Sequence, residues 1–345
     1  LGGMDFGEDH RHRTESILRL QMDTAIDEKV SARVRWDVIG NNGNNEWNGG
    51  NKNTARVKKA YIIIKDMFDF GGVFKFGRDK FLHGHGFVIY DYMDAVNYTK
   101  KCGDVNLTLN LFLERQGNKD SYNIWNINTD YSYKGHDMYF GFYYNDRAYD
   151  KNGVAYEDNR KEIRYEFGSY GKLTNKNDKY TYDLGLVYSD IEDGNGQGDD
   201  AQGLLGHFAF SYDSKKEFGA KLSYTYADDE SKANIKVSNL NAPTMSYETI
   251  FDDLYLVSLA ADAGTNKTFQ NLRDYKLQLF YKLKNNNSHS FRLAYDYLEN
   301  IYDGRANTFN TVAGNPLVGF INDLKGNVIT FTYSYQLSKH TRLKV

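Results

Sequence analysis

The chain repeats one pattern about sixteen times between residues 17 and 337: roughly ten residues alternate apolar with polar, end in a short polar turn, and begin again. In residues 327–337, for example, Ile329 and Phe331 point to one face of an extended strand and Thr330 points to the other. Such alternation is typical of a β-strand with one apolar and one polar face. It constrains the fold more than any other feature of the sequence.

A soluble sheet covers its apolar face with a second layer of structure. Here every strand carries the same aromatic-rich face, and the sequence shows no helical period that could supply such a layer. A closed barrel in a bilayer resolves the problem, because lipid covers the apolar outside and water fills the polar inside. The sequence therefore predicts an all-β fold, a transmembrane antiparallel β-barrel of the bacterial outer membrane.

The composition agrees with a barrel and argues against helical membrane proteins. Mean hydropathy is -0.69, yet the chain holds 29 Tyr and 21 Phe. Tyrosine suits the aromatic girdles of a barrel, where its ring meets lipid and its hydroxyl reaches the headgroups. The two prolines, Pro243 and Pro316, fall in expected loops, and no apolar run reaches the roughly 18 residues of a transmembrane helix.

The alternation places strands along the whole of residues 1–345, which we interpret as a single barrel domain. The expected strands are 14–26, 29–39, 54–66, 72–80, 93–101, 104–115, 121–133, 136–148, 159–173, 178–190, 202–213, 216–226, 271–283, 288–299, 326–337 and a stub from 341. Short turns alternate with long loops, which bacterial barrels place outside the cell. The expected extracellular loops are 40–53, 81–92, 149–158, 191–201, 227–270 and 300–325.

The direction of the first and last strands bears on the strand number. With long loops outside, the first strand runs from the exterior to the periplasm, and the stub after Thr341 runs the other way. Single-chain barrels start and finish on the periplasmic side and have an even number of strands. We therefore expect one more strand beyond each end, or eighteen in all, with a barrel of sixteen strands as the alternative.

Alternation also assigns each side chain to lipid or to the lumen. In strand 14–26, Leu18, Leu20 and Met22 face lipid and Arg19 faces the lumen. In strand 54–66 the same rule sends Val57, Tyr61 and Ile63 outward and Arg56 and Lys58 inward. The residues that we expect to line the pore are Arg19, Arg33, Arg35, Arg56, Lys58, Lys75, Arg78, Arg160, Arg164, Lys276 and Arg292.

On the lumen face of the first four strands we expect six basic groups, opposed by Asp23 and Asp37. Arginine stays charged and binds carboxylates in a bidentate manner, and basic side chains around a pore favour anions. One interpretation is therefore an anion-selective channel. The other is that charged pairs merely fill and stiffen a wide lumen without selecting a solute.

One segment resembles a known family. Residues 76–86 read Phe-Gly-Arg-Asp-Lys-Phe-Leu-His-Gly-His-Gly, and the basic run Arg56 to Tyr61 precedes them. A strand that ends in Gly-Arg, followed by a further glycine, resembles the alginate-export porin family. A second similarity is the segment Ile250 to Tyr255, which precedes Asn-Leu-Arg at residues 271–273. The resemblance implies an 18-stranded monomeric barrel, an electropositive lumen and loops that narrow the channel.

Other classes of function find less support. His83 and His85 flank Gly84, but two imidazoles without a third ligand do not define a metal site. His207 faces the lumen without a readable partner for catalysis. We expect no enzyme activity, no metal, no cofactor and no nucleic acid partner.

The sequence thus predicts passive diffusion of anionic or polar solutes, with anionic saccharides among them. The alternatives are a general diffusion porin and a structural or adhesive barrel. The expected partners are outer-membrane lipid, lipopolysaccharide and small solutes. We expect a monomer, with a trimer as the alternative.

Overall fold

The computed structural model describes most of the strands and their short turns. The described residues are 14–42, 53–69, 71–116, 119–149, 155–174, 179–192, 201–214, 217–228, 272–283, 289–299, 301, 325–336 and 342–344. Side chains near several strand ends lie outside this description, among them that of Arg160.

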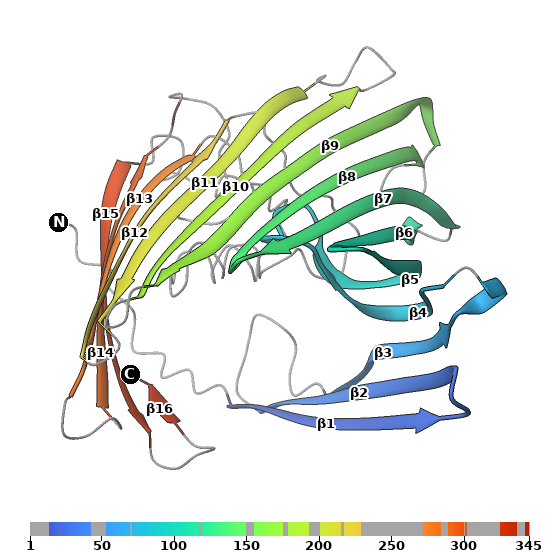
Figure 1. Ribbon diagram of the computed structural model, residues 1–345, viewed down its shortest axis with the longest axis horizontal. Coiled ribbons are helices and arrows are strands. Elements are labelled where there is room, and N and C mark those ends of the chain that lie inside the picture. The colour runs from blue at the N-terminus through green and yellow to red at the C-terminus, as the bar shows by residue number, and fades with distance from the viewer. Residues whose placement is uncertain are drawn as a thin grey trace.

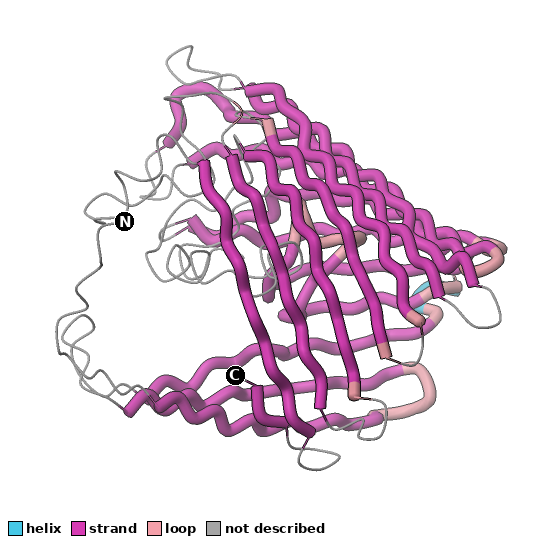
Figure 2. Tube along the Cα trace, turned by 90° about the vertical axis from the view of Figure 1, so that its left-hand side faces the viewer, coloured by secondary structure: helices cyan, strands magenta, loops and turns pink. Residues whose placement is uncertain are grey.

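The described residues form one antiparallel sheet of sixteen strands in sequence order, with each strand hydrogen-bonded to the next. Figure 1 looks along the space that this sheet surrounds, and Figure 2 shows the tilted strands side by side. The strands are β1 (Thr14–Ala25), β2 (Val30–Asn42), β3 (Asn53–Lys65), β4 (Val73–Leu82), β5 (Tyr90–Cys102), β6 (Val105–Gln116), β7 (Lys119–Tyr133), β8 (His136–Tyr149), β9 (Ala155–Thr174), β10 (Lys179–Glu192), β11 (Ala201–Asp213), β12 (Phe218–Ala227), β13 (Leu272–Lys282), β14 (His289–Glu299), β15 (Lys325–Gln336) and β16 (Arg342–Lys344).

The predicted all-β transmembrane barrel is confirmed, and each predicted strand agrees with an observed one to within four residues at either end. The largest difference is β9, which begins at Ala155. The only described helical turn is η1 (Met67–Asp69), between β3 and β4. No described helix has the length and apolar character needed to cross a membrane. β1 and β16 form the two edges of the described sheet, and the further strand expected beyond each end stays a prediction.

The sheet is apolar outside and polar inside. Large apolar side chains remain exposed on the outer face, among them Leu18, Leu20, Met22, Trp125, Leu222, Ile329 and Phe331. Buried polar side chains occupy the opposite face, among them Asn97, Asn110, Asn126, Glu162, Glu166, Lys276, Asp296 and Thr332. This is the reverse of a soluble protein, and it requires lipid around the sheet.

Short turns at one end of the sheet are built from local hydrogen bonds. Between β1 and β2, the Asp27 carboxylate accepts hydrogen bonds from the backbone N–H groups of Lys29 and Val30, both at 2.7 Å. Between β7 and β8, Lys134 and Gly135 both have positive φ, as a tight hairpin turn requires. We call this end of the sheet the short-turn end.

The tip of the β4–β5 hairpin leaves the wall of the barrel. Pairing of β3 with β4 ends at Ala60 opposite Arg78, and pairing of β5 with β6 begins only at Asp94 opposite Leu113. Residues 79–93, which we call the inner hairpin, therefore pair only with each other. Figure 1 shows the ends of β4 and β5 bending toward the middle of the surrounded space.

Gly77 makes this departure possible. Its φ is +118°, and a Cβ at this position would overlap the carbonyl oxygen of Ala60 on β3. Only glycine tolerates both the backbone angle and the close approach. The Gly-Arg pair in the sequence therefore marks the point where β4 separates from β3.

A bulge in β3 corrects one sequence prediction. The β2–β3 register shifts between Arg35, which faces Lys59, and Trp36, which faces Val57. Lys58 is the extra residue, so the alternation changes phase after it. Tyr61 is consequently buried inside, with 9 % of its surface exposed, and Ile62 is 45 % exposed on the outer face. The expected outward direction of Tyr61 and Ile63 is wrong, and Lys59 joins the inner face.

The bulge can be tested with single cysteines in a Cys102→Ser background. We expect Tyr61→Cys and Ile63→Cys to react with a charged, water-soluble thiol reagent, because they face the lumen. Ile62→Cys should resist, as should the control Val57→Cys, because both face lipid. Labelling of Ile62→Cys together with protection of Tyr61→Cys would show that β3 alternates without a bulge. The measurement is the extent of labelling by mass spectrometry.

Candidate functional site in the barrel lumen

The inner hairpin crosses the lumen and is bonded to the opposite wall. The imidazole of His85 contacts the Tyr139 hydroxyl on β8 and the Asp183 carboxylate on β10. The backbone N–H of His85 donates to the same Tyr139 hydroxyl at 3.2 Å. Gly84 lies against the Tyr139 ring so closely that a Cβ would overlap it. Gly84 and His85 thus attach the tip of the inner hairpin to β8 and β10.

His83 is held by two carboxylates on other strands of the same wall. Its Nε2 lies 3.3 Å from an oxygen of Asp130 on β7, and its Nδ1 lies 3.6 Å from Glu166 on β9. The Tyr143 hydroxyl on β8 donates to Glu166 at 2.7 Å. Burial disfavours the charged imidazole, but the two carboxylates outweigh it and raise the pKa of His83 from 6.5 to about 9. His83 is therefore positively charged at neutral pH.

Apolar side chains complete the attachment of the inner hairpin. Phe87, Val88 and Ile89 are buried. The Phe87 ring stacks on His85 with 5.0 Å between ring centroids. It lies close enough to Gly185 on β10 that a Cβ there would come within 2.7 Å of it. The loop predicted at 81–92 is thus a packed structure inside the lumen.

Basic side chains cover the lumen face of β1–β4, on the side away from the inner hairpin's attachment. We call this group the basic arc; its members are Arg19, Arg33, Arg35, Arg56, Lys58, Lys59 and Lys75. Asp37 accepts from Nε of Arg19 at 3.2 Å and from Nε of Arg35 at 3.0 Å. Asp79 lies 2.8 Å from the ammonium groups of both Lys59 and Lys75. Arg33 pairs with Asp23.

Three aromatic rings lie among these cations. The guanidinium of Arg35 lies 5.8 Å from the Tyr92 ring centroid and donates to its hydroxyl at 3.2 Å. The ammonium of Lys58 lies 5.0 Å from the same ring. Lys75 lies 5.5 Å from Tyr61 and 4.9 Å from Phe81. Such contacts hold the cations extended, because the face of each ring attracts positive charge.

The remaining predicted pore-lining residues are dispersed. Arg78 lies on the face opposite to Lys75 and bonds Asp94 at 3.1 Å. Arg164 pairs with Glu162 at 3.0 Å on β9, and Lys276 pairs with Asp296 at 3.1 Å across β13 and β14. Arg292 lies over the Phe280 ring at 5.8 Å. Arg160 belongs to β9, but its side chain lies outside the described residues.

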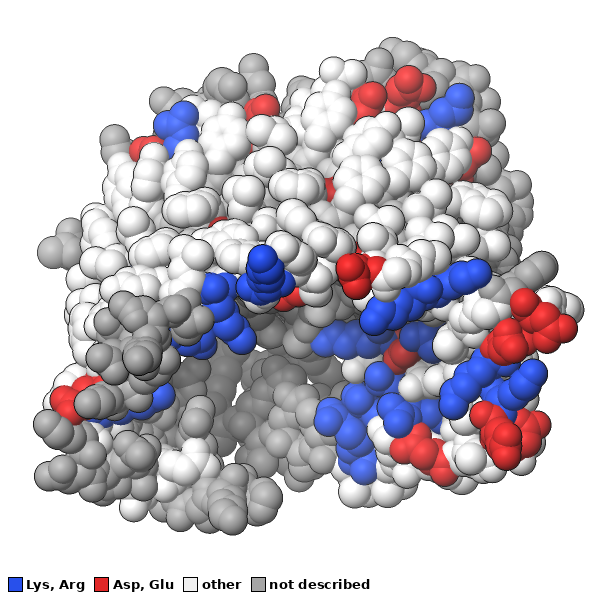
Figure 3. Space-filling model, viewed as in Figure 1, with Lys and Arg blue, Asp and Glu red and all other residues white. Residues whose placement is uncertain are grey.

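The structure therefore gathers Arg19, Arg33, Arg35, Arg56, Lys58 and Lys75, and it separates the other five predicted residues from them. Arg56 makes no ion pair with any described residue and is exposed. Figure 3 shows Lys and Arg side chains over β1–β4 bordering a hollow in the molecule. Among the described residues, the basic arc thus borders this hollow. The base of the inner hairpin contacts the arc through Asp79 and Tyr92, and its tip contacts β7–β10.

Sequence reasoning missed Lys59, Asp79, Tyr61 and Tyr92. The signal for Lys59 was the doubled lysine at 58–59, which interrupts the alternation and marks the bulge. No comparable signal marks Tyr92, because its place beside Arg35 depends on the inner hairpin leaving the wall. The predicted loops 227–270 and 300–325 lie almost wholly outside the described residues, as do most of 40–53 and 191–201 and half of 149–158.

His83 and His85 each lie beside carboxylates on other strands of the barrel. Among the described side chains, no group of three or more His, Cys, Asp and Glu has an arrangement suited to a metal ion. His83 and His85 instead bond carboxylates on separate strands. Their role is attachment of the inner hairpin.

No protein-family model matches the chain, and no curated protein sequence does either. Solved structures do resemble it. The outer membrane protein OprD of Pseudomonas aeruginosa has a TM-score of 0.60 at 9% identity, over 97% of this chain and 81% of that one. OccK2 (OpdF) of the same organism, in complex with glucuronate, has a TM-score of 0.64 at 9% identity, over 97% and 84%. OccAB1 of Acinetobacter baumannii has a TM-score of 0.56 at 9% identity, over 96% and 87%.

These comparisons correct the resemblance to the alginate-export porins. The similar structures are OprD and Occ proteins, and no family model supports the alginate-export assignment. The Gly-Arg pair that suggested it has a local cause, since Gly77 is where β4 leaves β3. At these identities the likeness concerns the fold: the chain folds as a bacterial outer-membrane β-barrel.

Proposed function

We propose that this protein is an outer-membrane channel that passes small anionic solutes by passive diffusion along the basic arc. The observation that carries the proposal is the division of the lumen by the inner hairpin. The histidines of the hairpin pair with Asp130, Glu166 and Asp183 on the opposite wall, and Glu166 is buried there. Much of the acidic charge on that wall is therefore bonded to His83 and His85, and the open side presents the arc.

The chemistry of the arc suits carboxylates. Arginine and lysine groups on β2 and β3 can exchange their bonds to aspartate for bonds to a passing carboxylate. Asp23, Asp37 and Asp79 compete for the same groups, so a solute is bound weakly enough to leave. A relative of the same fold is described in complex with glucuronate, which supports sugar acids as the first solutes to test.

A general diffusion porin is the second candidate. The observation that favours it is the pairing of Arg33 with Asp23 and of Arg35 with Asp37, which lowers the field that a solute meets. Both candidates are passive channels that perform no covalent chemistry.

We further propose that the barrel is a single domain, that it works as a monomer, and that its long loops face the cell exterior toward lipopolysaccharide.

Charge selectivity separates the two candidates. We expect a reversal potential that reports anion preference in a planar bilayer under a salt gradient at low ionic strength, where charges are least screened. Changing Arg33, Arg35, Arg56 and Lys58 together to glutamine should abolish most of that preference. The matched control changes Lys29, Lys101, Lys134 and Lys172, four exposed lysines in or beside short turns, to glutamine. An unselective wild-type pore, or an equal effect of the control, would leave only the general porin.

The inner hairpin is expected to limit conductance. Gly84 and Gly103 both have positive φ, +51° and +64°, so alanine strains the backbone at each site by about 1 kcal/mol. Only at Gly84 does the new Cβ also overlap a neighbour, the Tyr139 ring, whereas Gly103 has open space around it. We expect Gly84→Ala to displace the hairpin and raise single-channel conductance. Gly103→Ala should conduct like the wild type, and equal conductance of all three proteins would contradict the constriction.

His83 predicts a pH dependence of stability. Its pKa in the folded protein, about 9, exceeds the usual 6.5, so its contribution is complete below pH 6.5 and is lost as pH rises through 9. The difference corresponds to at most roughly 3 kcal/mol. We expect the free energy of unfolding in detergent to fall over this range for the wild type and for the control His289→Gln. A similar fall in His83→Gln would show that other groups cause it.

A further inference from the structure

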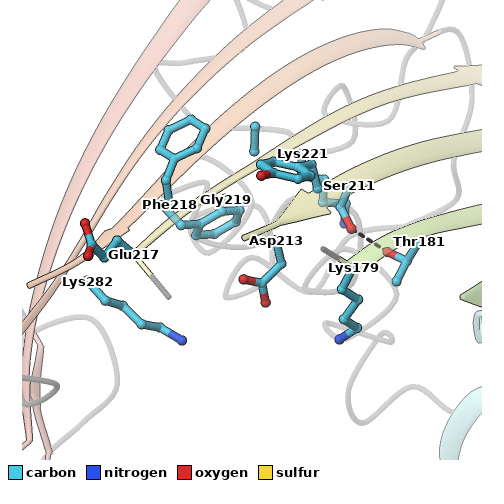
Figure 4. Close-up of a pocket in the computed structure, with 12 residues that line it drawn as sticks. Lys179, Thr181, Ser211, Asp213, Glu217, Phe218, Gly219, Lys221 and Lys282 are labelled. Atoms are coloured by element: carbon cyan, nitrogen blue, oxygen red, sulfur yellow. Dashed lines mark hydrogen bonds between the residues drawn. The ribbon is translucent and has the colours of Figure 1, made fainter. Parts of the chain in front are cut away.

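A second cluster of polar groups surrounds a cavity far from the basic arc. The cavity has a volume of about 320 Å³ and lies at the short-turn end of β10–β13. Its lining includes Lys179, Lys221, Lys282, Asp213 and Phe280. Figure 4 shows Asp213 between the side chains of Lys282 and Lys179. This volume is at the lower limit of small-molecule sites, roughly 300–1,000 Å³.

The strand register explains why the cavity exists. One row of residues on the lumen face runs across five strands: Lys179, Asp213, Gly219, Phe280 and Arg292. Gly219 has no side chain, so a gap remains between the Asp213 carboxylate and the Phe280 ring. A Cβ on Gly219 would come within 3.0 Å of the Tyr212 carbonyl oxygen and 3.6 Å of the Phe280 ring. The cavity is thus part of the sheet rather than an accident of loops.

The next row adds hydroxyl groups and another ammonium. Thr181 faces Ser211, and Ser211 faces Lys221. The two hydroxyls are hydrogen-bonded to each other, as Figure 4 shows. The guanidinium of Arg292 lies over the Phe280 ring from the far side of the row, 5.8 Å from its centroid. The lining therefore combines three ammonium groups, the carboxylates of Asp213 and Glu217, paired hydroxyls and the Phe280 ring.

This combination selects among ligands. A simple inorganic anion would use the ammonium groups and leave the ring and hydroxyls without a role. A neutral sugar could use the ring and hydroxyls but would have no group for the lysines. A sugar acid uses all of them: its carboxylate meets ammonium, its hydroxyls meet Asp213 and Ser211, and its C–H face packs on Phe280.

We infer that the cavity of β10–β13 is a binding site for a monomeric sugar acid at the short-turn mouth of the lumen. The inference rests on the proposed channel function. It adds a second binding site for the solute, on a different wall of the barrel from the basic arc. A solute that leaves the arc would meet this site before it leaves the barrel.

The test is isothermal titration of the folded full chain in detergent with sodium glucuronate, and with glucose as the neutral probe. We expect glucuronate to bind more tightly than glucose. The double variant Lys179→Gln/Lys282→Gln should weaken glucuronate binding by about tenfold or more, because two ammonium partners are lost. The matched control is Lys29→Gln/Lys134→Gln, two exposed lysines in turns outside the cavity. Phe280→Leu is a second variant that keeps every charge and should also weaken binding.

Each result decides the inference. Absent glucuronate binding to the wild type, unchanged binding in both cavity variants, or loss of binding only in Arg33→Gln/Arg35→Gln would overturn it. Weaker binding in the cavity variants, with the control unchanged, would support it. The channel proposal is read separately from the reversal potential: weakened binding together with an unselective pore would refute anion selectivity and leave this site intact.

Discussion

The fold depends on one constraint: within the hydrocarbon layer, each backbone N–H and C=O must find its partner inside the protein. An antiparallel sheet that curves round on itself meets this demand. Each of the sixteen described strands is hydrogen-bonded to the next strand in the sequence. The apolar face of every strand then has to look outward and the polar face inward. Exposed Leu20 and Phe331, set against buried Asn126 and Lys276, show the result.

The functional site arises where this constraint is relaxed. Beyond Gly77, β4 gives up its pairing with β3, and β5 is not yet paired with β6. The inner hairpin pairs its own backbone between β4 and β5, and His83 and His85 join it to the far wall through ion pairs. Because it rests on the acidic wall, it leaves the basic arc beside the open part of the lumen. Departure of one hairpin therefore sets both the width and the charge of the proposed passage.

The sequence predicted the strands well because lipid enforces the period of two over the whole barrel. The prediction was wrong at β3, because the extra residue Lys58 reverses the alternation of inward and outward side chains. Tyr61 therefore faces the lumen and not the lipid. The prediction also failed to find the contacts of Tyr92 and His85, because these join strands far apart in the chain and depend on where pairing stops. The family resemblance misled for a related reason. Gly77 reports a backbone requirement, and a backbone requirement does not identify a solute.

The most direct test of the account is whether the inner hairpin lies across the lumen in the membrane. Phe87 of the inner hairpin lies against Gly185 on β10. His85, in the same hairpin, contacts Asp183 on β10, and 98 positions in the sequence separate these two residues. A Phe87→Cys/Gly185→Cys protein, with Cys102 changed to serine, can be treated in outer membranes with a short bifunctional thiol reagent. If the inner hairpin lies against β10, an efficient intramolecular crosslink should form between them. Free, separately labelled cysteines at both positions would contradict it, because the hairpin would then lie away from the far wall.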